Sequence, residues 1–385
     1  MTGRPAGHRR PRARDAGLTL VELMITLVVA AAVTSSTFVF FAGQQRIYDT
    51  QTKLLNVQQN LWMSMEVMAR QLRASGTGMT GCSTGTVPPG NEAIPNTGIR
   101  AWRDDIGAFR IPPIHINNGE NGAPDEVTFS FFTNASGNYI DGALDEPITQ
   151  SFNGSNIKTL DSTPFREGEM IILFDIRPNP PNGDRGCTMY QITGIAGNSD
   201  LAIVNPQSPW NATGQTPPEL VPFDYLPANT GIRNLGTLTS IRYFIDATGA
   251  PGRPPRLMID DLANPDPAQI LAEGIEDMQI AYACDTQPVG NLDGNLSEGT
   301  TPAARLADEG TYNQAGDVPP PACGVPSAIR ITLLGRSLNP ETSLIGTSGS
   351  GTVSNSLKPA VEDGVAGAPD AFRHRTLTTT IYPRN

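Results

Sequence analysis

The stretch LTLVELMITLVVAAAVTSSTFVFFA, residues 18–42, decides how this chain is organised. It holds 25 residues with a single charge, Glu22, and its last 20 residues are uncharged. As a helix, the uncharged part would be about 30 Å long, which is the thickness of a bilayer core. A secretory signal has a shorter apolar core of about 7 to 15 residues, followed by small residues at a cleavage site. We therefore expect a membrane-spanning helix that the mature protein keeps.

The 17 residues before this segment are basic, and the rest of the chain is acidic. Residues 1–17 carry one Asp and five Arg, at positions 4, 9, 10, 12 and 14. Because arginines favour the cytoplasmic side of a membrane, we expect residues 1–17 inside the cell and everything after about Gln44 outside. The remainder carries 22 Lys and Arg against 37 Asp and Glu, a net charge of −15. An acidic body repels phosphate, so nucleic acid is not an expected partner.

Glu22 is unfavourable inside a membrane, where a carboxylate costs about 2.5 to 3.5 kcal/mol at mid-depth and less near an interface. One explanation is that its side chain reaches the headgroups, since Glu22 lies one turn inside the segment. The other is that a cation from another chain pairs with it. The charge alone does not separate the two.

A helical pattern continues past the membrane segment. Apolar side chains recur on one helix face, at Ile47, Leu54, Leu61, Met65, Met68 and Leu72. We expect one helix from Leu18 to about Arg73, ended by the glycines of Ser75–Gly78. The run Thr34–Thr37 is a place where this helix could loosen. We expect the apolar face to pack on the chain's own sheet, with a coiled-coil partner as the alternative.

The remainder of the chain is rich in strand patterns and in turns. With 39 Gly and 34 Pro, the chain is not a helical bundle. Alternating or β-branched residues predict strands at 126–133, 169–176, 187–195, 238–246, 256–259, 275–282, 328–334 and 376–382.

These patterns predict an α+β fold, in which a long N-terminal helix packs on an antiparallel β-rich domain with long loops. The expected organisation is a leader at 1–17, a helix at 18–75 and one globular domain at 76–385. The helix would span the membrane over 18–42 and be amphipathic over 43–75.

The residues around the start of the helix resemble the class III signal of type IV pilins and type II secretion pseudopilins. That signal is a basic leader ending in Gly, followed by an apolar helix with Glu at its fifth position, as in Gly17, Leu18 and Glu22. The resemblance implies that a prepilin peptidase cuts after Gly17 and that the amine of Leu18 is methylated. It also implies that Glu22 neutralises the terminal amine of a neighbouring subunit. The family most often has Phe where this chain has Leu18, and it tolerates the difference.

The carboxy-terminal half resembles the minor pilin family PilW. Gly274–Tyr282 follows the family pattern Gly-(Ile/Val)-Glu-x-(Leu/Met)-x-(Ile/Val)-x-Tyr, and the chain ends in Arg384-Asn385. Ile329–Ser337 and Phe372–Arg375 lie between them, in the family's order. The resemblance leaves residues from about 82 to 231 without support.

Together the two resemblances imply a pilin-like fold and a structural role, that of a minor pilin that primes or caps assembly of a type IV pilus. The implied partners are other minor pilins, the major pilin, the prepilin peptidase, the inner membrane and a tip adhesin. The chain would cross the inner membrane once, with a periplasmic body that later lies in the surface pilus. A minor pseudopilin of a type II secretion system is the nearest alternative. A signal-anchored extracytoplasmic adhesin or hydrolase is another.

The sequence lacks the pattern of an enzyme or a metal site. It has no Walker motif, and no nucleophile or dinucleotide motif lies between a predicted strand and a predicted helix. His115 and His374 are the histidines after residue 17, and His374 lies between two arginines, as on a solvated strand edge. The acidic turns 141–146 and 285–298 offer oxygen ligands for calcium without EF-hand spacing, so we expect solvated loops. No enzyme activity, cofactor or metal is expected.

Four cysteines follow the membrane segment, in a compartment where disulfides persist. They allow three pairings. We predict Cys284 with Cys323, because these residues would face each other at the base of one loop if the strands beside them are adjacent and antiparallel. Cys82 with Cys187 then follows by elimination.

Overall fold

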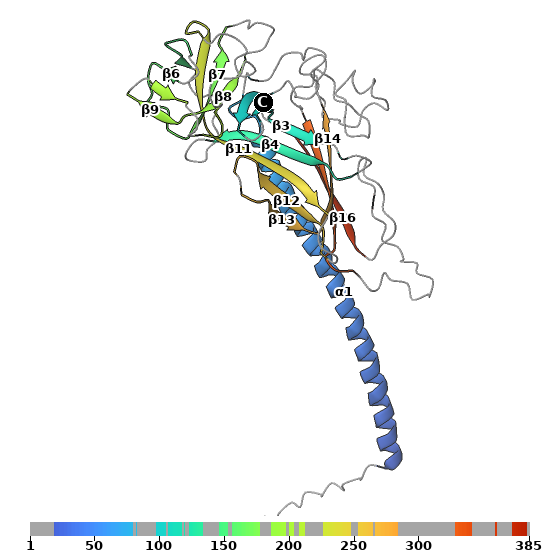
Figure 1. Ribbon diagram of the computed structural model, residues 1–385. Coiled ribbons are helices and arrows are strands. Elements are labelled where there is room, and N and C mark those ends of the chain that lie inside the picture. Colours follow the sequence, from blue (N-terminus) through green and yellow to red (C-terminus); the bar gives the residue numbers. More distant parts are fainter. Residues whose placement is uncertain are drawn as a thin grey trace, which may run out of the picture. The chain divides into compact units, whose positions relative to one another are not determined.

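The computed structural model describes residues 19–79, 82, 98–104, 107–117, 119, 123–133, 146–152, 156–177, 186–197, 200–203, 208–211, 226–247, 253–264, 266–283, 328–340, 359 and 372–382. The chain divides into two compact units, residues 1–55 and residues 56–385. One helix, α1 (Leu20–Ala74), begins in the first unit and ends in the second (Figure 1).

The first unit contains the apolar start of α1. Its side chains are exposed along the whole segment, as for Phe38 at 73%. Among the described residues, α1 is the one helix that is long and apolar enough to cross a membrane. The run Thr34–Thr37, where the sequence suggested that the helix could loosen, is helical in the structure. The hydroxyls of Thr34, Ser36 and Thr37 donate to carbonyls of the preceding turn, at 2.7 to 2.8 Å, a kind of bond that slightly weakens a helix.

In the second unit, the end of α1 is amphipathic. Its buried side chains include Val57, Leu61, Met65, Met68 and Leu72, and they pack with strand residues in one hydrophobic core. This core confirms the prediction that the apolar face packs on the chain's own sheet. The face is shorter than expected, since Ile47 is 52% exposed. The helix ends at Ala74, and Gly76 follows with a φ of 80°, which few residues other than glycine adopt.

Within the described residues, sixteen strands form three sheets. The strands are β1 (Ile99–Arg103), β2 (Gly107–Ile111), β3 (Ile114–Asn117), β4 (Glu126–Thr133), β5 (Glu146–Pro147), β6 (Asn156–Lys158), β7 (Met170–Asp175), β8 (Thr188–Gln191), β9 (Gly194–Ala196), β10 (Asp200–Ala202), β11 (Thr230–Asp246), β12 (Arg256–Asp261), β13 (Gln269–Glu273), β14 (Ile275–Ala283), β15 (Ala328–Arg336) and β16 (His374–Ile381). The largest sheet has ten strands, of which seven follow the order β13-β12-β11-β7-β8-β1-β2, while β4 and β5 pair with β11 and β3 pairs with β4. The others are β6-β10-β9 and β14-β15-β16.

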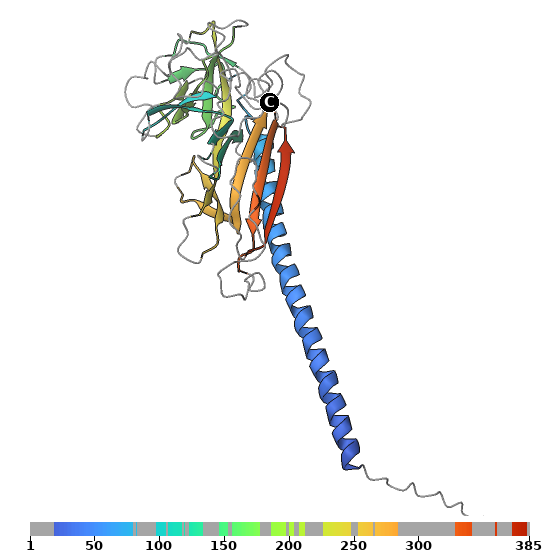
Figure 2. The ribbon, with the colours of Figure 1, turned by 90° about the vertical axis from the view of Figure 1, so that its right-hand side faces the viewer.

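The three strands β14, β15 and β16 lie beside the end of α1 (Figure 2). Both pairings are antiparallel, and β15 is the central strand. Alternate residues of β14 and β15, such as Met278, Ile280, Ile331 and Leu333, are fully buried against the helix. An antiparallel β-rich domain with a long N-terminal helix is therefore confirmed, and β1 with β8 is a parallel exception.

Strands with a clear sequence pattern are close to their predicted bounds. β4, β7, β12, β14, β15 and β16 begin and end within two residues of prediction. The predicted strand 187–195 is divided into β8 and β9, and β11 begins eight residues earlier than the predicted 238. The prediction missed the short strands β1, β2, β3, β5, β6, β10 and β13.

Gly335 of β15 lets the helix approach the sheet. A Cβ atom at this position would lie 3.0 Å from Cγ1 of Val57 and 3.2 Å from Cγ of Leu61. We expect Gly335→Val to lower the free energy of unfolding by about 1 to 3 kcal/mol, because a well-packed core has no room for added methyl groups. Denaturant unfolding of the full chain in detergent measures the change. The matched control is Gly194→Ala on β9, where the new Cβ would meet its nearest atom at 3.8 Å. Equal stability of the two variants would contradict this account of the packing.

Candidate functional site

The residues Thr19–Glu22 form the N-terminal cap of α1. The backbone N–H of Glu22 donates to Oγ1 of Thr19 at 3.3 Å, and the N–H of Leu23 donates to the Thr19 carbonyl at 3.1 Å. Thr at the cap and Glu three residues later is the spacing of a capping box. A carboxylate in the first turn is also favoured by the helix dipole, by about 0.3 to 1 kcal/mol at an exposed position. Glu22 therefore suits this position even within an isolated chain.

The carboxylate of Glu22 is exposed, and the bond to Thr19 uses only the backbone of Glu22. The side chain is thus placed at the start of α1 among apolar residues that are themselves exposed, such as Leu20, Leu23 and Ile25. Gly17 and Leu18 lie outside the described residues. Because α1 begins at Leu20, the bond between Gly17 and Leu18 precedes the first residue of the described helix.

His374 is not on a solvated strand edge, contrary to the expectation from its two arginine neighbours. Its side chain is 3% exposed, and Nε2 lies 3.2 Å from Oε2 of Glu276 on β14. The two residues join the outer strands of the β14-β15-β16 sheet. Burial and a carboxylate partner give His374 a structural role. His115 lies on β3, and its imidazole lines a pocket.

Two glycine-containing strings near the end of α1 resemble enzyme motifs by spacing alone. Residues 76–81 have the spacing Gly-x-Gly-x-x-Gly, and residues 81–85 have the spacing Gly-x-Ser-x-Gly. Both follow a helix, whereas the corresponding enzyme loops follow a strand. Gly76 and Gly78 instead continue the turn after α1, and Cys82 is joined to another cysteine. The acidic turns 141–146 and 285–298 lie outside the described residues, apart from the backbone of Glu146.

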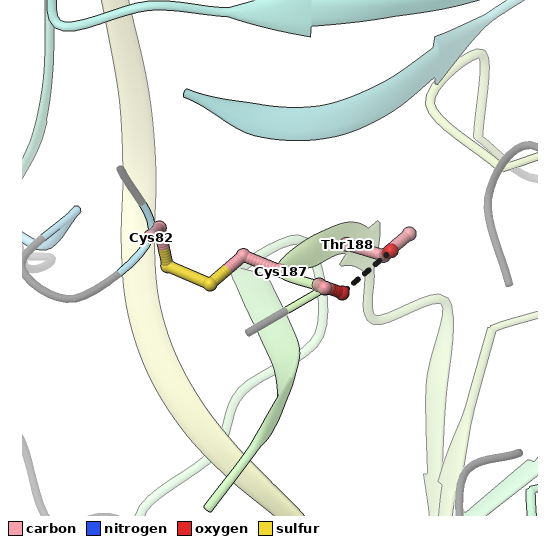
Figure 3. Close-up of a disulfide and its surroundings, with 4 residues drawn as sticks. Cys82, Cys187 and Thr188 are labelled. Atoms are coloured by element: carbon pink, nitrogen blue, oxygen red, sulfur yellow. Dashed lines mark hydrogen bonds between the residues drawn. A yellow bond between two sulfur atoms is a disulfide. The ribbon is translucent and has the colours of Figure 1, made fainter. Parts of the chain in front are cut away.

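Cys82 and Cys187 form a disulfide, the pairing that the sequence left by elimination (Figure 3). Their Cα atoms are 5.4 Å apart, within the usual range for a disulfide. Both residues are buried in a core with Met79, Ile99 and Met189. Thr188 follows, and its hydroxyl donates to the Gly186 carbonyl at 3.2 Å. The disulfide covalently links the segment after α1 to the residue before β8.

Cys284 and Cys323 lie outside the described residues, but the strands beside them meet the condition for their pairing. β14 and β15 are adjacent and antiparallel, and Ala283 is paired with Ala328 at their ends. Cys284 directly follows Ala283, and Cys323 precedes Ala328 by five residues. In the sequence, the two cysteines therefore flank two strand ends that are paired with each other.

We expect non-reducing peptide mapping of the native protein to yield a crosslinked peptide that joins Cys284 to Cys323. A crosslink over a 40-residue segment stabilises a protein by about 3 to 4 kcal/mol in the chain-entropy model. The double variant Cys284→Ser/Cys323→Ser should unfold at correspondingly lower denaturant concentration. The control is either single variant, which should lose the same crosslink and leave one alkylatable thiol. A peptide that joins Cys284 or Cys323 to Cys82 or Cys187 would contradict the pairing.

The two ends of the chain match known families. Residues 12–38 match the prokaryotic N-terminal methylation motif, and residues 242–385 match the type IV pilus-assembly protein W family, PilW. Both resemblances seen in the sequence are thereby confirmed. Neither description is that of an enzyme. The chain matches no curated protein and no solved structure.

Proposed function

We propose that this pilin-like, type IV pilus-related chain is a minor pilin, a structural subunit that primes or caps assembly of the pilus. The observation that carries the proposal is the presence, in one chain, of a methylation motif at residues 12–38 and a PilW match at residues 242–385. A pseudopilin would also have the methylation motif. The PilW match, in contrast, is to a family of type IV pilus assembly proteins.

The apolar part of α1 supplies the surface for assembly. Its side chains are exposed in the isolated chain, so neighbouring subunits or lipid must cover them. In that environment an unpaired charge is strongly disfavoured. Glu22 would therefore select the axial position at which a cation, the amine of Leu18 in a neighbouring subunit, lies beside it.

The proposed life cycle starts in the inner membrane, where α1 anchors the chain with the body in the periplasm. The prepilin peptidase removes residues 1–17 and methylates Leu18. The processed subunit then joins other minor pilins and the major pilin, with a tip adhesin as a further partner. The function is assembly and involves no catalysis.

Co-purification from detergent-solubilised membranes tests this proposal. Pull-down of the tagged chain after brief crosslinking should recover other minor pilins and the major pilin. Unprocessed Gly17→Leu bait is the matched control and should recover few of them. Recovery of type II secretion pseudopilins in their place, or of the same proteins with both baits, would overturn the proposal.

A further inference from the structure

A pocket of about 300 Å³ lies on the face of the β3-β4-β11 layer that is turned away from α1. The strand register explains which side chains reach it. Ser130 of β4 is paired with Ser240 of β11, and Thr128 of β4 is paired with His115 of β3. The alternate residue Phe129 of β4 points the other way, into the core beside α1. The pocket is thus separate from that core.

Aromatic and aliphatic side chains form the walls of this pocket. Phe109 of β2 and Trp210 are a tilted ring pair with centroids 6.2 Å apart, and Leu238 of β11 and Ile111 of β2 complete the apolar surface. Trp210 is only 8% exposed and belongs to a packed core, so its ring is held in place. Fixed walls that include two aromatic rings suit an aromatic ligand, since tilted ring pairs attract each other.

Two buried serines form the polar part of the pocket. The Oγ atoms of Ser130 and Ser240 are 3.1 Å apart and share a hydrogen bond. Two hydroxyls have two O–H groups, and one shared bond uses only one of them. Among the residues that the structure describes, neither hydroxyl makes a further hydrogen bond. A ligand that displaces solvent from the second O–H without offering an acceptor therefore loses affinity.

A phenol ring has the same division into an apolar part and one polar group. Its hydroxyl oxygen can accept from the second O–H of the serine pair, and its own O–H can donate to a serine lone pair. Benzene would leave the serine O–H without an acceptor. A sugar, with hydroxyls around its ring, would place several of them against apolar walls without partners. The ligand need not be charged, because the guanidiniums of Arg103 and Arg110 beside the pocket are engaged in other interactions.

We propose that this pocket binds a neutral phenolic ring, with the ring against Phe109 and Trp210 and the hydroxyl on Ser130 and Ser240. The apolar walls select the ring, and the serine pair selects the hydroxyl. These four residues precede residue 242, so the family match over 242–385 does not cover them. The site is therefore a property of this chain beyond its proposed role in assembly.

Isothermal titration of the full chain in lauryldimethylamine oxide tests the proposal, with the heat of mixing into empty micelles subtracted. Phenol should bind with a dissociation constant below about 1 mM, and about tenfold or more tightly than benzene, which lacks the hydroxyl. Equal binding of benzene would overturn the role of the serine pair. Tighter binding of benzoate than of phenol would overturn the choice of a neutral ligand. No saturation by phenol at about 1 mM would overturn the site.

The double variant Ser130→Ala/Ser240→Ala separates binding from folding. Replacing both partners of a hydrogen bond leaves no buried donor unpaired, so the variant should fold. Its preference for phenol over benzene should fall from about tenfold to less than about threefold. The matched control Ser162→Ala removes another buried serine hydroxyl, which donates to the Gly197 carbonyl at 3.3 Å, and should keep the full preference. Retention of the full preference in the double variant would contradict the placement of the phenol hydroxyl.

N-acetyltyrosinamide distinguishes two sources of such a ring. If it binds at least as tightly as phenol, its peptide groups fit the mouth of the pocket, and the ligand is a tyrosine side chain of another polypeptide. If it binds more weakly than phenol, the peptide groups do not fit, and the ligand is a free small phenol. In the first case N-acetylphenylalaninamide, which lacks only the hydroxyl, should bind about tenfold more weakly than the tyrosine compound. Equal binding of the two amides would overturn the assignment of the hydroxyl.

Discussion

Gly17→Leu is expected to leave the chain uncut and to abolish its incorporation into pili. The motif match over residues 12–38 includes Gly17 and Leu18, so the bond between them is the expected cleavage point. A bulky side chain cannot occupy the small pocket that the resemblance implies for the peptidase. The uncut chain would keep residues 1–17 with their five arginines. These charges cannot enter a membrane at modest cost, so residues 1–17 would stay on the cytoplasmic side and hold the chain in the inner membrane.

Intact mass or amino-terminal sequencing decides this prediction. The wild-type chain should begin at Leu18 with a methylated amine, and Gly17→Leu should begin at the original amino terminus. Gly17→Ala is the matched control, because its small side chain should still allow cleavage. Recovery of an uncut wild-type chain from cells with a working peptidase would sink the prediction, and so would a wild-type cut near Ala42.

Long, strongly periodic elements were predictable from the sequence because many residues contribute to their pattern, so one atypical residue does not hide it. α1 has a pattern over 55 residues, first apolar throughout and then amphipathic, and its end is marked by Gly76 and Gly78. The alternation in β4 and the apolar content of β14 and β15 likewise come from burial on a fixed face. In each case the positions of the apolar residues in the sequence match the face that the element buries.

The first half of β11 was not predictable, because its glycines and Asn234 are typical of a turn. Gly231 is needed for a close approach, since a Cβ there would lie 2.6 Å from Cγ2 of Ile176. Gly236 has a φ of 70° and follows a shift in the register between β11 and β7. Asn234 and Gly236, residue types that are common in turns, thus flank a β-bulge inside a strand. Only the pairing with the neighbouring strand β7 distinguishes a bulge from a turn at these residues.

The prediction missed short strands for another reason. β6 and β10 have three residues each, too few to show a period of two. They are strands because Leu201 of β10 pairs with Ile157 on one side and Ile195 on the other. Long-range pairing of this kind has no local signal.

The functional residues differ in the same way. Glu22 was identifiable because a lone carboxylate in an apolar segment stands out along the chain. The contact between His374 and Glu276 was not, because it joins two strands that are far apart in the sequence.

Glu22→Lys is expected to give the largest loss of surface pili among substitutions at this position, with Glu22→Ala intermediate. If Glu22 pairs with the amine of a neighbouring subunit, Glu22→Ala leaves that amine unpaired in a low-dielectric environment. Removing one partner of a buried ion pair costs about 3 to 5 kcal/mol, which lowers the docked population by more than about a hundredfold. Glu22→Lys adds repulsion between two cations to that cost. Both variants should still be inserted and processed.

Glu22→Gln distinguishes a role of the carboxylate in assembly from a role in capping α1. Gln is accepted at the third helical position of a capping box, and the bond from the backbone of residue 22 to Thr19 is kept. If the carboxylate serves the helix alone, Glu22→Gln should produce normal pili and Glu22→Ala only a small loss, since a cap contributes about 1 kcal/mol. If the charge sets the register between subunits, Glu22→Gln should lose pili as severely as Glu22→Ala. Counting sheared pili by electron microscopy, with processed subunit levels matched by immunoblot, distinguishes the two. Normal piliation in Glu22→Ala and Glu22→Lys alike would mean that the side chain only reaches the headgroups. The different outcomes for Gln follow from one physical fact: an amide keeps the hydrogen bonds of a cap but cannot neutralise an amine.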